Sequence, residues 1–184
     1  IRDRFQTVSI ASTTGFASSD FNLWPDFSRY VLLLLMFVGG CSGSTAGGMK
    51  VSRFVILLKV TWAELRRTIH PRLVYSIKMG GRNVPPVVVG NVTRFFYLYM
   101  IVFSTLTLLI SLTGLSMLDS MGIIAACMSS VGPAFGIVGP TATYADVSTF
   151  GRLVVIAAMI LGRLEIFTLL IIMRPDFWRV KRNW

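Results

Sequence analysis

The sequence is poor in charged residues, especially acidic ones, and in the residues that bind metals. Only 14% of its 184 residues are Asp, Glu, Lys or Arg, whereas a soluble domain carries about 25%. It contains one histidine, His70, and two cysteines, Cys41 and Cys127, too few for a zinc site or a disulfide framework. These shortages argue against a cytosolic enzyme, and we expect the cysteines to be small packing residues.

Apolar residues take the place of the missing charge. They make up 54% of the chain, with a mean hydropathy of +0.69, which excludes a disordered chain. A helix needs about 20 apolar residues to cross the bilayer core, and two uninterrupted runs reach that length, residues 95–115 and 153–173. The chain also begins at Ile1 inside an expected helix, with no start methionine or signal peptide. We therefore expect a piece of a longer, all-α polytopic membrane protein.

A glycine-rich segment separates two apolar runs that are each too short to span the bilayer, residues 30–38 and 54–63. Glycine weakens helices, and irregular backbone survives at membrane depth only where it is buried in protein or lines a wet cavity. We interpret the two runs as one membrane helix with a break that faces a transport pathway. This glycine-rich break consists of Gly39, Gly40, Cys41, Ser42, Gly43, Ser44, Thr45, Ala46, Gly47 and Gly48.

Two further apolar segments have about half the length of a membrane span. Residues 121–131 follow Leu118-Asp119-Ser120, which we take as a helix start, and a helix of that length reaches about 16 Å. The N-terminal segment from Asp3 to Ser12 is similar. We predict that both are re-entrant pore helices. The alternative, that such short apolar helices only pack in a core, stays open.

The two half-length segments end in similar loops, 117 residues apart. We call them the N-terminal loop, residues 13–16, and the C-terminal loop, residues 130–133. Each has a hydroxyl residue, a small or β-branched residue, a glycine, and then a bulky or rigid residue. Repeated membrane segments usually flank a substrate site, so we predict a repeated unit of outer helix, pore helix with loop, and inner helix. The loop residues are Thr13, Thr14, Gly15, Phe16, Ser130, Val131, Gly132 and Pro133.

These loops have the chemistry of a potassium filter. Four of them around an axis would present backbone carbonyls that replace the hydration shell of a potassium ion, and the hydroxyls of Thr13 and Ser130 would add further oxygens. The negative C-terminal ends of the pore helices favour cations. We therefore expect potassium as the transported ion, bound at the filter, and no organic cofactor.

The same offset of 117 pairs Arg163 with Ala46 in the break. A charge at the bilayer centre costs at least about 2.5 to 3.5 kcal/mol, which makes Arg163 a candidate functional residue. An ion pair with Glu165 is the alternative, although residues two apart face different sides of a helix. We predict that Arg163 faces the pore beside the break.

Positive charge is unevenly distributed and predicts an orientation. Nine of the 18 Lys and Arg residues lie within residues 50–94, and four more lie in the tail. The positive-inside rule places residues 64–92 and 174–184 in the cytoplasm. The basic stretch serves either topology and attraction to anionic membrane lipids or docking of a soluble regulatory subunit. It offers too few stacking aromatics for nucleic acid.

Two enzyme-like strings occur in the break. Residues 40–43 fit the Gly-x-Ser-Gly string of rhomboid-type intramembrane proteases, but a nucleophilic serine needs a base within reach, and His70 lies in the basic cytoplasmic segment. Residues 43–48 resemble the start of a phosphate-binding loop, but Met49 stands where that loop needs lysine. We expect no enzymatic activity, and an intramembrane serine protease remains the disfavoured alternative.

Several strings in order resemble the Trk-type potassium uptake proteins of bacteria. They are residues 40–51, His70-Pro71 with Val74-Tyr75 and Ile77-Lys78, and residues 162–168 with Phe177-Trp178. The resemblance covers essentially the whole chain. It implies the C-terminal part of a pseudo-fourfold pore built from four pore-loop repeats. The end of the third repeat would occupy residues 1–68, a basic cytoplasmic connection 69–92, the fourth repeat 93–173 and a cytoplasmic tail 174–184.

The resemblance also implies site roles and partners. The family's potassium filter falls on the two loops, its intramembrane gate on residues 39–48, and its gate-contacting arginine on Arg163. Family members form homodimers in the bacterial inner membrane and are regulated by a cytosolic, nucleotide-binding ring protein. Ala134 stands where the family is expected to have glycine, and Ser130 where asparagine is frequent, changes that would loosen selectivity over sodium. A related alternative with the same loops is the potassium-binding subunit of an ATP-driven pump.

Overall fold

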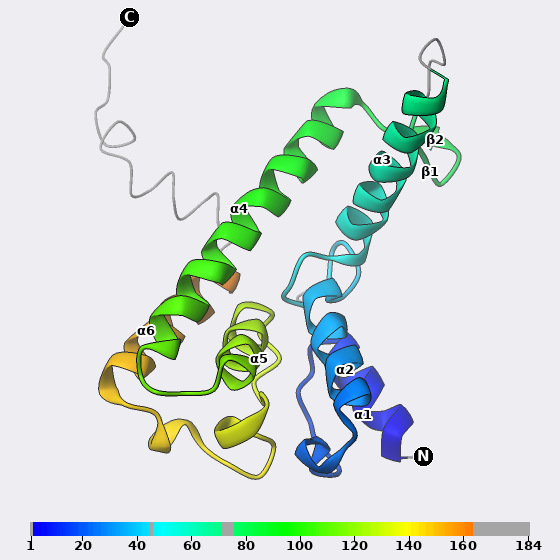
Figure 1. The fold of residues 1–184 in the computed structure, drawn as a ribbon. Coiled ribbons are helices and arrows are strands. Elements are labelled where there is room, and N and C mark those ends of the chain that lie inside the picture. Colours follow the sequence, from blue (N-terminus) through cyan, green and yellow to red (C-terminus); the bar gives the residue numbers. More distant parts are fainter. Residues whose placement is uncertain (1, 45, 71–75, 164–184) are drawn as a thin grey trace, which may run out of the picture.

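The computed structural model describes residues 2–44, 46–70 and 76–163 and is mostly helical. Helices α1 and α2 pack together, α4, α5 and α6 pack on one another, and α3 extends with the start of α4 away from both groups (Figure 1). In chain order the elements are α1 (Arg2–Ala11), η1 (Phe21–Leu23), α2 (Asp26–Val38), α3 (Val51–Ile69), β1 (Lys78–Met79), β2 (Arg82–Asn83), α4 (Pro86–Ser111), α5 (Met117–Met128), η2 (Gly136–Val138), η3 (Tyr144–Asp146) and α6 (Thr149–Arg163).

Helix α4 is, within the described part of the chain, the one helix long and apolar enough to cross a membrane by itself. Pro86 occupies its first turn, where a missing N–H costs nothing. The helix begins there rather than at residue 95, because Asn91 and Arg94 interrupt the apolar run without interrupting the helix. The second predicted span begins earlier than expected, with α6 at Thr149. Its residues 164–173 lie outside the described residues.

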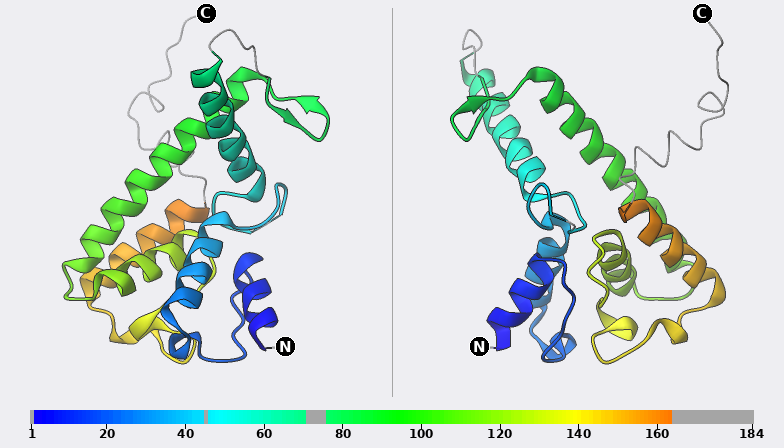
Figure 2. Two further views of the ribbon diagram at one scale, coloured as in Figure 1. Left: turned by 45° about the vertical axis from the view of Figure 1, so that its right-hand side comes forward. Right: turned by 180° about the vertical axis from the view of Figure 1, so that it is seen from behind.

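Helices α2 and α3 correspond to the two halves of the predicted broken helix. α2 ends at Val38, α3 begins at Val51, and the two run in roughly the same direction with the break between them (Figures 1 and 2). α2 starts at Asp26, before the apolar run at residue 30, because Pro25 sets the extended backbone that precedes the first turn.

The two ends of the break are hydrogen-bonded to each other. The N–H of Met49 donates to Phe37 O at 3.2 Å, and that of Val51 donates to Gly40 O at 3.0 Å. Gly39 reverses the chain after α2 with a left-handed φ of 66°, which glycine adopts without strain. The break is therefore a closed loop inserted between two helices rather than an extended linker.

Helices α1 and α5 are the two half-length helices, ten and twelve residues long. The predicted boundaries of the second, at residues 121 and 131, were wrong. α5 begins at Met117 because the hydroxyl of Ser116 caps it, accepting a hydrogen bond from the N–H of Asp119 at 3.1 Å. Asp119 lies in the first turn, where a negative charge interacts favourably with the positive end of the helix dipole and stabilises the helix. The helix ends at Met128, because the chain reverses directly after it.

Both half-length helices end with the same backbone geometry. The second residue of each reversal is left-handed, with φ of 55° at Thr13 and 56° at Ser130, and a left-handed glycine follows two residues later, Gly15 or Gly132. The similarity of the two loops therefore extends from the sequence to the backbone. Three backbone hydrogen bonds also recur at the offset of 117. After α1 the N–H of Ser12 donates to Val8 O, that of Thr13 to Ile10 O and that of Thr14 to Ser9 O. After α5 the N–H of Ser129 donates to Ala125 O, that of Ser130 to Cys127 O and that of Val131 to Ala126 O.

Helix α5 lies at the centre of the packing and contacts α2, α4 and α6. Its residues from Gly122 to Met128 are all buried. The ring of Phe135 lies against Gly122, where a Cβ would come within 2.8 Å of the ring. The same ring meets the edge of Phe21 with centroids 5.4 Å apart. Because Phe21 follows one loop and Phe135 the other, this contact joins the two predicted repeats.

A two-stranded hairpin departs from the all-α expectation. Lys78 pairs with Asn83 and Met79 with Arg82, and residues 80 and 81 are glycines with φ of 57° and 78°, which a tight hairpin turn requires. The hairpin follows α3 and lies within the predicted basic connection. Lys59 on α3 donates from Nζ to the carbonyl of Lys78 at 2.6 Å, so this part of the connection packs back on the helix.

Substitution of two helical glycines, Gly162 and Gly90, would test how tightly α6 packs on α5. A Cβ on Gly162 would lie 2.1 Å from Met128 O, whereas one on Gly90 in α4 would meet nothing within 4 Å. We predict that Gly162→Ala destabilises the protein by about 1–3 kcal/mol through overpacking, and that Gly90→Ala is neutral or stabilises it by up to about 1 kcal/mol. Thermal unfolding of the detergent-purified full-length protein measures both, and equal melting temperatures for the two variants would contradict the packing described.

Candidate functional site

The two predicted filter loops lie side by side. A Cβ built on Gly15 would lie 1.9 Å from Val131 O and 3.2 Å from Cδ of Pro133, so the backbone of the N-terminal loop touches a carbonyl of the C-terminal loop. Gly15 has a φ of 79°. Two features therefore disfavour a side chain at this position: the left-handed backbone angle and the neighbouring carbonyl.

Helix α1 holds the N-terminal loop with two polar side chains. The hydroxyl of Ser9 donates to Phe16 O at 2.6 Å, and Gln6 Oε1 accepts from the N–H of Ser18 at 3.3 Å. Both side chains are buried, with Gln6 0% exposed and Ser9 5%. Buried polar groups contribute stability when they are hydrogen-bonded, so these two residues fix the loop relative to its own helix.

The C-terminal loop is held from a different direction. Tyr144 in η3 donates from its hydroxyl to Gly132 O at 2.7 Å, and the same hydroxyl lies 3.4 Å from Cys127 Sγ. Burial raises the pKa of Tyr144, so the hydroxyl retains the proton that it donates. One side chain from the segment after the loop thus contacts both the loop and the end of α5.

The glycine-rich break contacts both loops through Gly47. Its N–H donates to Thr13 Oγ1 at 3.3 Å, and a Cβ at this position would lie 2.1 Å from Ser129 O and 3.1 Å from Cβ of Ser130. Gly47 is buried. At the tip of the break, by contrast, Gly43 is exposed with open space around it. One side of the break therefore lies against the loops while its tip has room to move.

Arg163 lies beside the break and the C-terminal loop. It lines a cavity of about 170 Å³ together with Ala46 and Gly47, and a wider hollow of about 590 Å³ together with Ser130 and Gly132. The offset of 117 had paired Arg163 with Ala46, and the structure brings these two residues to one cavity. That Arg163 faces a pore stays a prediction.

The smaller cavity is strongly basic. Lys50 and Arg53 line it together with Arg163, and the guanidinium of Arg53 lies over the ring of Phe95 with 4.3 Å between Cζ and the ring centroid. Three basic side chains thus line the cavity next to the two predicted filter loops.

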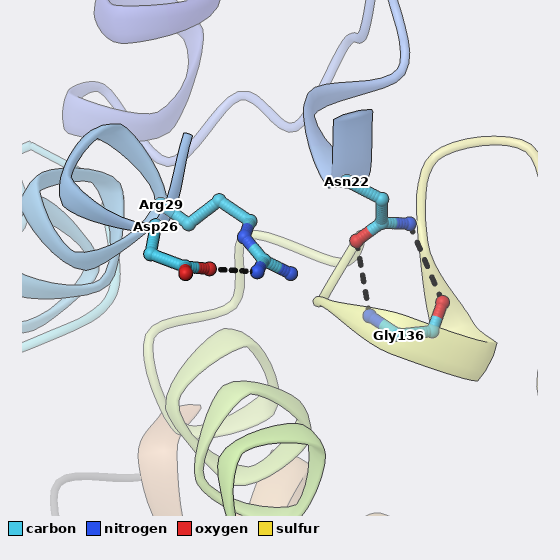
Figure 3. A network of polar contacts seen from close by, with 4 residues as sticks. All are labelled: Asn22, Asp26, Arg29 and Gly136. Carbon is cyan, nitrogen blue, oxygen red and sulfur yellow. Dashed lines mark hydrogen bonds and ion pairs between the residues drawn. The ribbon is translucent and has the colours of Figure 1, made fainter. Parts of the chain in front are cut away.

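A second contact between the predicted repeats lies at η1 and η2 (Figure 3). Asn22 accepts from the N–H of Gly136 at 3.0 Å and donates from Nδ2 to Gly136 O at 3.3 Å. One side-chain amide thereby bonds to both backbone groups of one residue, whose carbonyl also accepts from the N–H of Gly139 at 3.2 Å. The same picture shows Arg29 paired with Asp26 at the start of α2. Asn22 comes from the first repeat and Gly136 from the second, so the pair fixes their relative position.

The structure brings together most of the predicted site but not all of it. Thr13, Gly15, Val131, Gly47 and Arg163 lie in one neighbourhood. Phe16 has a side chain that is 71% exposed. Thr45 of the break, Glu165 as the alternative partner of Arg163, the tail motif and residues 71–75 of the connection lie outside the described residues.

The protease hypothesis finds no support in the described geometry of Ser42. Its hydroxyl contacts the hydroxyl of Ser52, and a hydroxyl does not act as a general base. His70 follows the far end of the 19-residue helix α3, and such a helix is about 28 Å long at 1.5 Å per residue. The serine and the histidine therefore lie at opposite ends of one helix.

Sequence reasoning missed four residues of the site: Gln6, Ser9, Asn22 and Tyr144. A signal for the first two existed, since Gln6, Ser9 and Ile10 occupy one face of a short helix, and polar residues on a buried face point to hydrogen bonds. Asn22 bonds to the backbone of Gly136, far along the chain. Tyr144 bonds to the backbone of Gly132, across a loop. No local pattern indicates such contacts.

Comparisons with known proteins agree with this architecture. Residues 1–179 match the TrkH family, described as cation transport protein. The chain is 45% identical over 175 residues to the Trk system potassium uptake protein TrkH of Vibrio parahaemolyticus, covering 95% of this chain and 36% of that protein. It is 41% identical over 175 residues to TrkH of Escherichia coli K12, with the same coverage of both.

A solved structure is also similar. The crystal structure of the potassium transporter TrkH from Vibrio parahaemolyticus superimposes with a TM-score of 0.86 at 45% identity, over 95% of this chain and 37% of that chain. The chain spans about a third of the length of the curated relatives it matches. These matches place it among membrane transport proteins for cations. The chain belongs to the TrkH family.

The contact between the two predicted repeats provides a stability test. Asn22→Ala leaves the N–H and the carbonyl of Gly136 without their side-chain partner, and we expect a loss of about 1–3 kcal/mol. Asn91→Ala, at an exposed position on α4, is the matched control and should change stability by less than about 0.5 kcal/mol. Thermal unfolding of the full-length protein compares them. If both variants melted alike, the Asn22 contact would contribute nothing.

Proposed function

We propose that this chain forms part of a potassium uptake pathway, contributing two of the pore-loop repeats that surround the ion. The observation that carries the proposal is the contact of Gly15 with Val131 O, because loops from different repeats must lie next to each other to surround one ion. The relatives named above are potassium uptake proteins and a potassium transporter, which supports potassium as the ion.

In this proposal, carbonyls of the two loops replace part of the hydration shell of the ion. The left-handed backbone at Thr13, Gly15, Ser130 and Gly132 alternates with ordinary backbone, and that alternation turns successive carbonyls toward one side. Helices α1 and α5 end where the loops begin, so their negative dipole ends favour a cation there. Ala134 is fully buried and its N–H donates to Val138 O at 2.9 Å, so its methyl group is accommodated within the protein.

The break and Arg163 act as the gate in this proposal. Gly47 lies against both loops, and Arg163 lines the cavity next to it. A cation leaving the filter would meet the loop and the positive charge together. Moving the break away from the loops removes the first obstacle, which makes a segment with an unpacked tip at Gly43 suitable for opening and closing.

The remaining features of the proposal concern the whole protein. Residues 64–92 and 174–184 lie in the cytoplasm and the helices in the bacterial inner membrane, following the distribution of positive charge. A second copy of the protein and a cytosolic nucleotide-binding ring protein are the proposed partners. The basic connection, with its hairpin and the end of α3, is the described part available to such a partner or to anionic lipid.

Two other functions remain to be separated from uptake. A potassium-binding subunit of an ATP-driven pump would share the loops but require a separate ATPase, so its transport would stop on ATP depletion. An intramembrane serine protease would lose cleavage of a membrane substrate on Ser42→Ala, and the position of His70 disfavours it. Rubidium uptake by the full-length protein in uptake-deficient cells distinguishes transport from proteolysis directly.

The role of Gly132 in the filter gives the first functional prediction. Gly132→Ser forces a side chain onto a residue with φ of 101°, at a strain of about 1–3 kcal/mol. We expect the selectivity for potassium over sodium to fall at least about fivefold. Gly114→Ser is the matched control, because Gly114 also has a left-handed φ, 86°, and open space, but lies between α4 and α5. Unchanged selectivity in Gly132→Ser would remove this residue from the filter.

The role of the break gives the second prediction. Deleting residues 43–47 removes the contacts of Gly47 with both loops, and we expect rubidium flux per protein to rise because the obstruction is gone. Flux is measured in vesicles after the amount of protein in the membrane has been determined. Reduced flux at a normal amount of protein would show that the break is needed for the structure of the filter and not for closing it.

A further inference from the structure

Tyr144 lies in a segment that differs between the two repeats. The connection from the loop glycine to the inner helix runs from Gly15 to Asp26 in the first repeat and from Gly132 to Thr149 in the second, so the second connection is longer. Tyr144 lies within this longer connection. Its ring packs against the hydrophobic core, and its hydroxyl reaches back to Gly132 O at 2.7 Å.

The carbonyl that Tyr144 holds belongs to an unusual peptide unit. The next residue is Pro133, which has no N–H, so the carbonyl is the only hydrogen-bonding group of this peptide. Gly132 has a φ of 101°, and a Cβ there would meet nothing within 4 Å. Cδ of Pro133 packs near Gly15, but neither packing at the Cα of Gly132 nor a bond on the N–H side fixes the direction of the Gly132 carbonyl. In the described part of the chain, Tyr144 donates the side-chain hydrogen bond that does.

The first repeat holds its loop with a different residue and at the next carbonyl, because Phe16 corresponds to Pro133 at the offset of 117. Its loop is held by Ser9, whose hydroxyl donates to Phe16 O at 2.6 Å from within the pore helix. The residue 117 positions later is Ala126, which has no hydroxyl. The second pore helix therefore cannot hold its own loop in this way, and the longer connection supplies the missing hydroxyl.

We propose that Tyr144 is a positioning residue for ion selectivity, which acts by fixing the direction of the Gly132 carbonyl in the C-terminal loop. The inference rests on the proposed function, because it needs that loop to be part of a filter. A filter distinguishes ions by the number and direction of the oxygens around them. Freed from Tyr144, the plane between Gly132 and Pro133 rotates, and the C-terminal loop no longer offers one fixed set of oxygens.

The experiment is a competition assay on the full-length protein in uptake-deficient cells. Rubidium uptake is measured against increasing potassium or sodium, and the ratio of the two inhibitory concentrations reports selectivity independently of the amount of protein. We expect Tyr144→Phe to lower this ratio about fivefold, the size expected for losing one neutral hydrogen bond. Tyr97→Phe, at a position on α4 that is 64% exposed, is the matched control and keeps the ratio.

Tyr144→Leu separates the hydroxyl from the packing of the ring. It removes both, so it lowers the amount of folded protein more than Tyr144→Phe, yet it should lower the selectivity ratio by the same factor. A ratio that is unchanged in Tyr144→Phe while Gly132→Ser lowers it would overturn this inference and leave the proposed filter standing. A ratio that Gly132→Ser leaves unchanged would remove Gly132 from the proposed filter and would overturn this inference with it. A loss of protein amount alone in both Tyr144 variants would show a purely structural role and would also overturn the inference.

Discussion

Three glycines from three different elements lie against the carbonyl end of helix α5, and the arrangement of the site depends on these contacts. Gly162 of α6 lies on Met128 O, Gly47 of the break on Ser129 O, and Gly15 of the N-terminal loop on Val131 O. The last carbonyls of a helix have no partner within the helix, and a glycine Cα is small enough to approach them closely. The inner helix, the predicted gate and the other loop therefore converge on one helix end.

The residues that sequence reasoning located correctly are those whose chemistry is local. The reversal after each half-length helix, the break and the neighbourhood of Arg163 all follow from glycine spacing and from one repeat offset. The start of α5 at Met117 was missed because the helix is capped by Ser116 and not by the later Asp119 or Ser120. The early start of α4 was missed because a helix tolerates polar residues that interrupt an apolar run.

The contacts that the sequence does not reveal join distant segments through backbone groups. Asn22 bonds to both backbone groups of Gly136, and nothing in either local sequence marks the pairing. Tyr144 and Ser9 serve similar loops from opposite sides. A repeat in sequence therefore predicts that two loops share a backbone path. It does not predict which side chains hold them, because different residues hold the two loops.

The hydrogen bonds that close the break have a consequence for the speed of any opening movement. Met49 is bonded to Phe37 and Val51 to Gly40, so a movement of the segment between them would leave the ends of α2 and α3 in place. Loop movements of this kind take nanoseconds to microseconds, whereas tilting whole helices takes microseconds to milliseconds. If the break is the proposed gate, it would open and close on the faster of these two timescales, and slower regulation would only need to change the fraction of time that it stays closed.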